Sequence, residues 1–218
     1  MMEPIARSVT STDWITLVLL GSLLCLVAAK VLFYSRFLNF IILPFNNKYI
    51  GLYNKKERLF NGFQTLLAMF FITNGALFLY FANSLFKIVG VDQEPLGFPM
   101  VFGGLLVFLL LKVFLQLGNG WLFGAYALFN ELIYKKISYL TYSGLALFFA
   151  NVVMTYLFLD SKPAFYVGFF LFLSINLIGW FTVLKNSQKI VAHHFFYFIL
   201  YLCALEIAPV VIIGHLLK

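Results

Sequence analysis

Apolar residues run along this chain in stretches long enough to cross a lipid bilayer, with short polar segments between them. A crossing helix needs about 20 mostly apolar residues. Six stretches meet this requirement, at 13–33, 60–86, 98–117, 138–159, 163–184 and 191–216. The apolar character is nearly continuous after residue 98, so five or seven crossings also fit the pattern. We therefore predict an all-α integral membrane protein with about six transmembrane helices in one bundle.

The composition points to the same fold class. Hydrophobic residues make up 63% of the chain and charged residues 11%, whereas an average soluble domain is roughly a quarter charged. The mean hydropathy is +0.97. We expect residues 1–218 to form a single polytopic domain. The net charge of +7 does not indicate nucleic-acid binding, because the basic residues lie in the short segments between predicted helices.

The first apolar stretch, "DWITLVLLGSLLCLVAA", also has features of a secretory signal peptide, with a conceivable cleavage position after Ala29. Cleavage there would place the basic segment that follows outside the membrane. Because that location contradicts the charge pattern of the other segments, we interpret this stretch as an uncleaved first helix.

Basic residues alternate between rich and poor segments along the chain. The poor segments carry only Lys87 and Lys162. The rich segments carry nine basic residues: Arg36, Lys48, Lys55, Lys56 and Arg58 in the first, Lys135 and Lys136 in the third, and Lys185 and Lys189 in the fifth. Segments rich in lysine and arginine stay in the cytoplasm. We therefore expect a multi-pass protein of the bacterial inner membrane with both termini in the periplasm.

Two segments do not fit a simple crossing. "RFLNFIILPFNNKYI" is apolar, aromatic and basic and contains Pro44, which suits a short helix in the cytoplasmic interface or, equally, a packed loop. "GNGWLFGAYALFNELIYKK" begins with Gly118 and Gly120. It fits either a second interfacial helix or a continuation of the third crossing past a kink, and we favour the interfacial helix.

Two charged residues, Lys112 and Glu206, fall deep inside predicted crossings. A charge at the centre of a membrane helix costs about 2.5–3.5 kcal/mol on insertion scales, and such residues usually face protein or water. The predicted boundaries place the two backbones at depths that differ by roughly 6–9 Å, which a long lysine side chain can bridge.

Two interpretations of Glu206 remain open. In the first, it forms a buried ion pair, or a hydrogen bond in its neutral form, that fixes helix packing. In the second, it is a proton- or ion-coupled site that takes up and releases protons. Pro209 follows three residues later and frees main-chain carbonyl groups near Glu206, which produces either a simple kink or a cation or proton site. We favour the kink alone.

Three asparagines, Asn74, Asn151 and Asn176, lie at middle depth in the second, fourth and fifth crossings. Amides at this depth usually form hydrogen bonds between helices. The functional alternative is a polar cavity that these residues line together with Glu206 and Lys112.

Motifs for several kinds of chemistry are missing. His193 and His194 are adjacent and point about 100° apart on a helix, and His215 falls at the opposite predicted membrane face. Cys25 and Cys203 lie in separate apolar stretches. There is no phosphate-binding loop, no GxSxG and no HExxH. We expect no metal and no cofactor, and we do not expect an enzyme.

The C-terminal stretch "FYFILYLCALEIAPVVIIGHLLK" resembles a family of small bacterial integral membrane proteins defined as a domain of unknown function. The resemblance rests on Tyr201, Cys203, Leu205, Glu206, Ile207 and Pro209, and "FNNKYIGLYNKKERLFNGFQTLL" is similar to the first cytoplasmic loop and second helix of that family. It implies a polytopic inner-membrane protein and assigns no catalytic residue, cofactor or substrate.

Two functions compete on this basis. The favoured one is a non-enzymatic inner-membrane subunit or scaffold of a larger envelope complex, with the lipid bilayer and a membrane protein or a second copy of the chain as partners. The alternative is a small proton- or ion-coupled transporter that uses Glu206 and Lys112. A lipid-modifying enzyme has the least support, because no catalytic groups cluster near either membrane face.

Overall fold

The computed structural model describes residues 13–43, 61–86, 97–122, 126–158 and 161–186. The fold of these residues is all-helical, as predicted. Five of the helices are long and apolar enough to cross a membrane, which is consistent with a multi-pass membrane protein. The predicted crossing at 191–216 lies outside the described residues. The helices are α1 (Asp13–Leu32), α2 (Tyr34–Ile41), α4 (Gly62–Phe86), α5 (Gly97–Leu122), α6 (Tyr126–Tyr156) and α7 (Lys162–Asn186).

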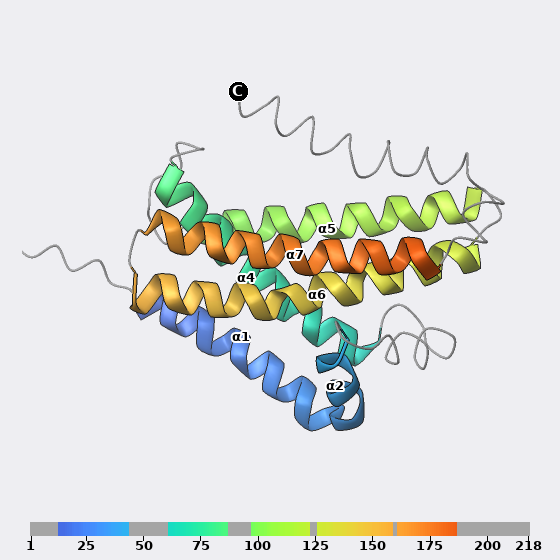
Figure 1. Cartoon of the computed structure of the whole chain (residues 1–218), viewed down its shortest axis with the longest axis horizontal. Helices are drawn as coiled ribbons and strands as arrows, with labels where there is room; N and C mark the ends of the chain where they lie inside the picture. Colours follow the sequence, from blue (N-terminus) through green and yellow to red (C-terminus); the bar gives the residue numbers. More distant parts are fainter. Residues whose placement is uncertain (1–12, 44–60, 87–96, 123–125, 159–160, 187–218) are drawn as a thin grey trace, which may run out of the picture.

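The long helices form an antiparallel bundle in which α4 and α6 occupy the centre (Figure 1). Helix α4 packs against α1, α5 and α6, and α6 packs against α4, α5 and α7. In α4, 56% of the most apolar stretch is buried, whereas no side chain in the corresponding stretch of α5 is buried. The bundle therefore has a central pair of helices with α1, α5 and α7 around it.

Local sequence explains where several helices begin and end. Pro99 and Pro163 lie in the first turns of α5 and α7, where the missing N–H leaves no hydrogen bond unformed. Phe33 has a φ of −133° and a ψ of 49° and separates α1 from α2. Helix α2 ends at Ile41, three residues before Pro44. A proline disfavours the helical conformation of the residue directly before it, here Leu43, so the helix could not have continued far beyond this point.

Helix α2 lies in the segment for which a short helix or a packed loop was expected, and the structure shows a helix. Phe37 and Phe40 are buried, and the Phe40 ring lies 5.8 Å from the ring of Phe63 at the start of α4. Leu38 and Ile41 remain exposed. The helix thus has one face against the bundle and one apolar face on the outside.

The prediction of a second interfacial helix near residues 118–136 is wrong. Residues 118–122 continue α5, and α6 begins at Tyr126, well before the expected start at residue 138. Hydropathy alone did not predict the start of α6, because Lys135 and Lys136 suggest a loop. In the structure Lys135 is 4% exposed, so packing against the bundle accommodates lysines within a long helix.

Two glycines allow α7 to lie very close to α6. A Cβ atom on Gly168 would lie 2.6 Å from the Cβ of Ala150, and a Cβ on Gly179 would lie 2.6 Å from the Cγ of Tyr139. Carbon atoms normally approach to about 3.5–4.0 Å. Residues eleven apart return to nearly the same side of a helix, so both glycines belong to one contact stripe.

Candidate functional site

A hydrogen bond between α4 and α6 lies at the centre of the bundle. Asn74 of α4 is 1% exposed and Asn151 of α6 is 0% exposed. The Asn151 side-chain amide donates to the main-chain oxygen of Asn74 at 2.9 Å. The Asn74 amide donates to the Phe70 main-chain oxygen, one turn earlier in α4, at 2.8 Å. Two of the three asparagines from the predicted polar cluster are therefore in direct contact.

The carboxamide oxygens of this pair remain available as acceptors. Both Nδ2 atoms face carbonyl oxygens, which fixes the orientation of the two amides. Each Oδ1 atom is buried and has no hydrogen-bond donor among the described residues. An unsatisfied buried acceptor costs about 1–3 kcal/mol. The pair consequently presents two oxygens suited to water, a cation or another proton donor.

Asn176, the third asparagine, does not join this pair. It lies on α7, is partly buried, and donates to the Phe172 main-chain oxygen of its own helix at 2.8 Å. Several neighbouring hydroxyl groups behave in the same way and bond to carbonyls one turn back in their own helices. They are Thr73, Ser138, Thr141, Thr155 and Ser174. The hydroxyl donors of these residues are therefore satisfied within their own helices.

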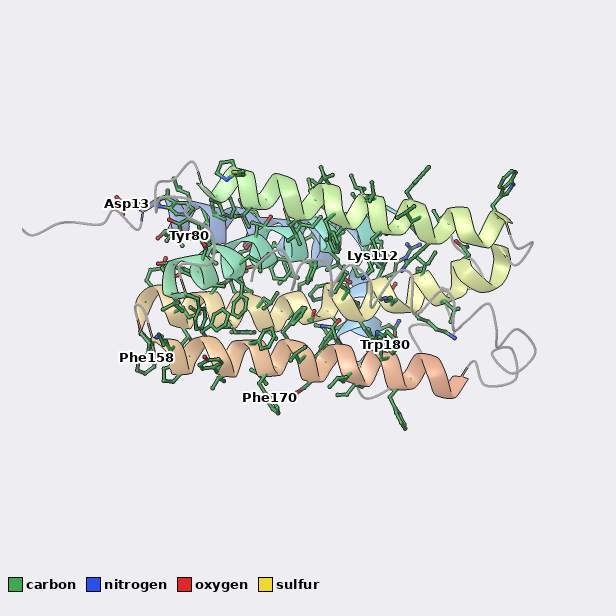
Figure 2. All side chains as sticks on the ribbon, turned by 90° about the horizontal axis from the view of Figure 1, so that it is seen from above. Asp13, Tyr80, Lys112, Phe158, Phe170 and Trp180 are labelled. Atoms are coloured by element: carbon green, nitrogen blue, oxygen red, sulfur yellow. The ribbon has the colours of Figure 1, made fainter. Side chains whose placement is uncertain are left out.

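Lys112 lies apart from the asparagines, toward the end of the bundle that carries α2. Its ammonium nitrogen lies 5.9 Å from the centre of the Phe108 ring. Figure 2 shows Lys112 between α5 and α6, and Trp180 on the α6 side of α7. The nitrogen of Lys136, on α6, lies 5.6 Å from the centre of the Trp180 ring. Lys112 thus contacts a ring of its own helix α5, whereas Lys136 contacts a ring of α7.

Sequence reasoning missed the contact of Lys136 with Trp180, because it assigned Lys136 to a loop. One signal was present: the apolar pattern of α6 continues on the N-terminal side of the two lysines, from Tyr126. Glu206 and Pro209 lie outside the described residues, as do Lys48, Lys55, Lys56 and Arg58 of the basic segment. Arg36 is described, and its guanidinium group lies 5.5 Å from the centre of the Phe33 ring.

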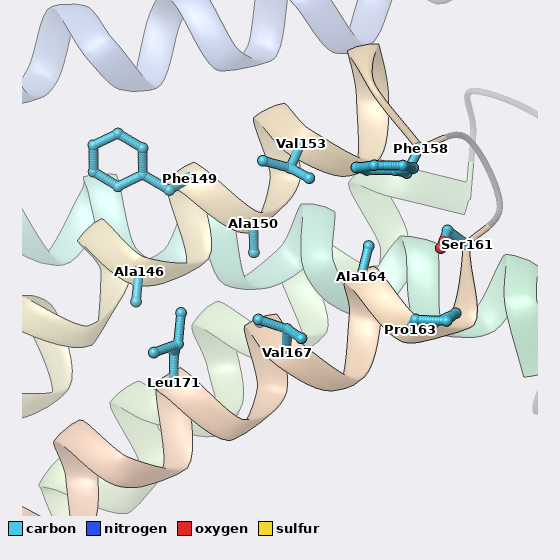
Figure 3. A pocket seen from close by; sticks show the side chains of 11 residues that line it. Ala146, Phe149, Ala150, Val153, Phe158, Ser161, Pro163, Ala164, Val167 and Leu171 are labelled. Carbon is cyan, nitrogen blue, oxygen red and sulfur yellow. The ribbon is translucent and has the colours of Figure 1, made fainter.

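An apolar groove of about 580 Å³ lies between α6 and α7. In Figure 3, Ala146 and Ala150 of α6 point toward Leu171 and Val167 of α7. Ser161, at one end, is the single polar residue among those that line it. The groove offers apolar contacts and no arrangement of groups for catalysis.

The comparisons with known proteins identify a family without assigning an activity. A search of the curated proteins and a search of the solved structures gave no match. A family model described as Domain of unknown function (DUF4271) matches residues 15–217. This match covers every described helix from the first turn of α1 onward. The chain therefore belongs to the DUF4271 family.

Proposed function

We propose that the chain is a multi-pass protein of the bacterial inner membrane and serves as a non-enzymatic subunit or scaffold of a larger envelope complex. The observation that supports this most strongly is the outer surface of α5. This helix has a mean hydropathy of 2.3, and none of its apolar stretch is buried in the described structure. A large apolar surface that the described helices leave uncovered suits contact with another membrane protein as well as with lipid.

The charges support an orientation. Arg36, Lys135 and Lys136 lie toward the end of the bundle where α1 meets α2 and where α6 begins (Figure 1). Segments rich in lysine and arginine remain in the cytoplasm. In the proposed topology this end is cytoplasmic, and both chain termini are periplasmic.

The proposal is tested by affinity purification from the native host in mild detergent. Leu111→Trp places a bulky group on α5, where Leu111 is 57% exposed. Leu24→Trp is the matched control on α1, where Leu24 is 62% exposed. We expect a stoichiometric partner with wild type and with Leu24→Trp, and its loss with Leu111→Trp. Loss with Glu206→Gln as well would make Glu206 part of the docking surface.

Recovery of the chain alone in every preparation would refute the subunit proposal. Co-purification of two differently tagged copies, with no second protein, would identify the partner as another copy of the chain. The outcome with Leu111→Trp then shows whether α5 forms that contact.

A small proton- or ion-coupled transporter is the second candidate. The observation in its favour is the pair of buried acceptor oxygens on Asn74 and Asn151, since oxygen atoms of this kind bind protonated groups and cations. The hypothesis predicts that neither Glu206→Gln nor Lys112→Gln restores the growth or stress phenotype of a deletion strain. Full rescue by both variants would exclude it.

A further inference from the structure

Helix α2 has an apolar face that no described helix covers. Side chains follow one another at about 100° around a helix, so Tyr34, Leu38 and Ile41 lie within roughly 60° of one another. Their exposed fractions are 60%, 44% and 43%. Phe37 and Phe40 lie beside this face and are buried against the bundle. The bundle therefore supports α2 from one flank and leaves the apolar face open.

The polar side chains of α2 lie on the side away from this apolar face. They are Ser35, Arg36 and Asn39, which the same spacing places roughly 100–200° from Tyr34. Ser35 is exposed, and Arg36 and Asn39 are partly exposed. Such a division, with apolar side chains on one side and polar ones on the other, is typical of a helix that lies at a membrane surface.

At the end of the bundle away from α2, helices α1, α5 and α6 are level with one another. The Trp14 ring, in the first turn of α1, lies 5.5 Å from the Phe98 ring in the first turn of α5. The hydroxyl groups of Thr16 in α1 and Tyr156, the last residue of α6, form a hydrogen bond at 2.8 Å. Any difference in length between these helices therefore appears at the end that carries α2.

Helix α1 is much shorter than the hairpin that α5 and α6 form. From Thr16 to Leu32 the axis of α1 covers about 24 Å, whereas α6 covers about 45 Å from Tyr156 back to Tyr126. The same comparison of α1 with α5 gives a smaller difference. The hairpin of α5 and α6 therefore extends roughly 10–20 Å past the end of α1, and Figure 1 shows both helices reaching beyond α1 and α2.

Helix α2 does not follow this hairpin outward. The Phe40 ring lies 5.5 Å from the ring of Tyr142 on α6, and the Tyr142 hydroxyl donates to the main-chain oxygen of Ile41 at 3.4 Å. Tyr142 lies about 21 Å from Tyr156 along α6, close to the 24 Å at which α1 ends. The last residue of α2 is thus at nearly the same level as its first, so α2 lies across the side of the bundle.

We propose that α2 lies along the cytoplasmic boundary of the hydrocarbon core, with its apolar face on lipid acyl chains and its polar face toward the head groups. The α5–α6 hairpin extends past it into the cytoplasm. From Asp13 to Leu32 α1 covers about 28 Å, close to the hydrocarbon thickness of about 30 Å, so the boundary falls where α2 begins. The inference rests on the proposed membrane location and orientation, and it is independent of the subunit role.

The test is a depth measurement by electron paramagnetic resonance on the full chain in vesicles of phosphatidylethanolamine and phosphatidylglycerol. Tyr34→Cys and Ile41→Cys each carry a nitroxide label, in a background in which both native cysteines are replaced by serine. Molecular oxygen reports contact of the label with lipid, and a water-soluble nickel complex reports contact with water. The controls are Leu24→Cys on α1 and Trp121→Cys near the end of α5, at side chains that are 62% and 77% exposed.

We expect oxygen to reach both α2 labels more readily than the nickel complex does, and both to lie about 12 Å nearer the membrane surface than the Leu24→Cys label. The depths of the two α2 labels should agree within about 5 Å, because a helix that pointed out along the membrane normal would separate them by about 10 Å. The Trp121→Cys label should be open to the nickel complex.

Four results would contradict these expectations. A separation of about 10 Å between the two α2 labels would overturn the proposal. Nickel access to them as free as at Trp121→Cys would do the same, because α2 would then face water, and so would shielding from both reagents, because protein would then cover it. Contact of the Trp121→Cys label with lipid would overturn the extension of the hairpin into the cytoplasm. Free nickel access at Leu24→Cys would refute the membrane location on which the proposal rests.

Discussion

The contact between α6 and α7 at Gly168 leads to a quantitative prediction. Gly168→Ala introduces a methyl group 2.6 Å from the Cβ of Ala150 and 3.2 Å from Cε2 of Phe78. The Ala150 methyl group is attached directly to the backbone, so it cannot rotate away as the tip of a long side chain can. One helix must therefore move by roughly 1 Å to restore normal carbon contacts.

The expected magnitude follows from two opposing effects. Overpacking of a close contact costs about 1–3 kcal/mol, and replacement of glycine by alanine within a helix gains about 0.8–1 kcal/mol. Gly103→Ala on α5 is the matched control, because nothing lies within 4 Å of a Cβ atom at that position. The difference between the two variants cancels the helix propensity and leaves the overpacking cost of about 1–3 kcal/mol.

The assay is size-exclusion chromatography of detergent-purified protein after stepwise heating, which reports an apparent melting temperature. For a chain of this size, 1 kcal/mol corresponds to about 2–4 °C, so Gly168→Ala should melt about 2–12 °C below Gly103→Ala. The double variant Gly168→Ala/Ala150→Gly moves the methyl group from α6 to α7. It should melt close to wild type, because the gain of helix propensity at one position and its loss at the other cancel. Melting of Gly168→Ala at or above the control, or of the double variant well below wild type, would refute the reasoning.

Three further predictions concern other parts of the bundle. Asn151→Ala removes the hydrogen bond to α4 and should lower the stability of the protein by about 0.6–2 kcal/mol. The control is Asn176→Ala, because Asn176 bonds only within its own helix, and it should lower the stability less in the same heating assay. Equal losses of stability would contradict this prediction. An alkaline phosphatase fused after residue 122 should be inactive and one fused after residue 160 active, and the reverse pattern would invert the topology. Phe78→Ala removes the ring whose centre lies 4.6 Å from that of Phe165 and should lower the free energy of unfolding by about 3–5 kcal/mol. Phe114 is an exposed side chain of α5, so the control Phe114→Ala should change the stability little.

Hydrophobic length was sufficient to predict four of the described long helices, and the reason is physical. A long run of apolar side chains leaves few structures other than a helix in which all main-chain groups are satisfied within the segment. The same criterion misplaced the start of α6, because it treats each lysine as a solvated residue. Lys135 is buried and Lys136 lies over the Trp180 ring, and both facts depend on which helices are neighbours.

The polar pair shows a second limit of sequence reasoning. Depth alone grouped Asn74, Asn151 and Asn176, because each lies near the middle of a predicted crossing. The structure joins Asn151 to Asn74 through a hydrogen bond, whereas Asn176 bonds within its own helix. The rotation of each helix about its axis decides this difference, and rotation depends on close contacts such as Gly168 against Ala150.

The central position of α6 has a consequence for how the protein is made. Its most apolar stretch has a mean hydropathy of 1.5, the lowest of the five long helices, yet 44% of that stretch is buried. Alone in lipid, such a helix would expose Lys135, Lys136 and Asn151 to hydrocarbon. In a membrane we therefore expect α6 to depend on its neighbours on both sides. Helices α4 and α5 are synthesised before α6, whereas α7, which packs most extensively against it, is synthesised afterwards. We expect the polar residues of α6 to be fully covered only after α7 has followed it into the bundle.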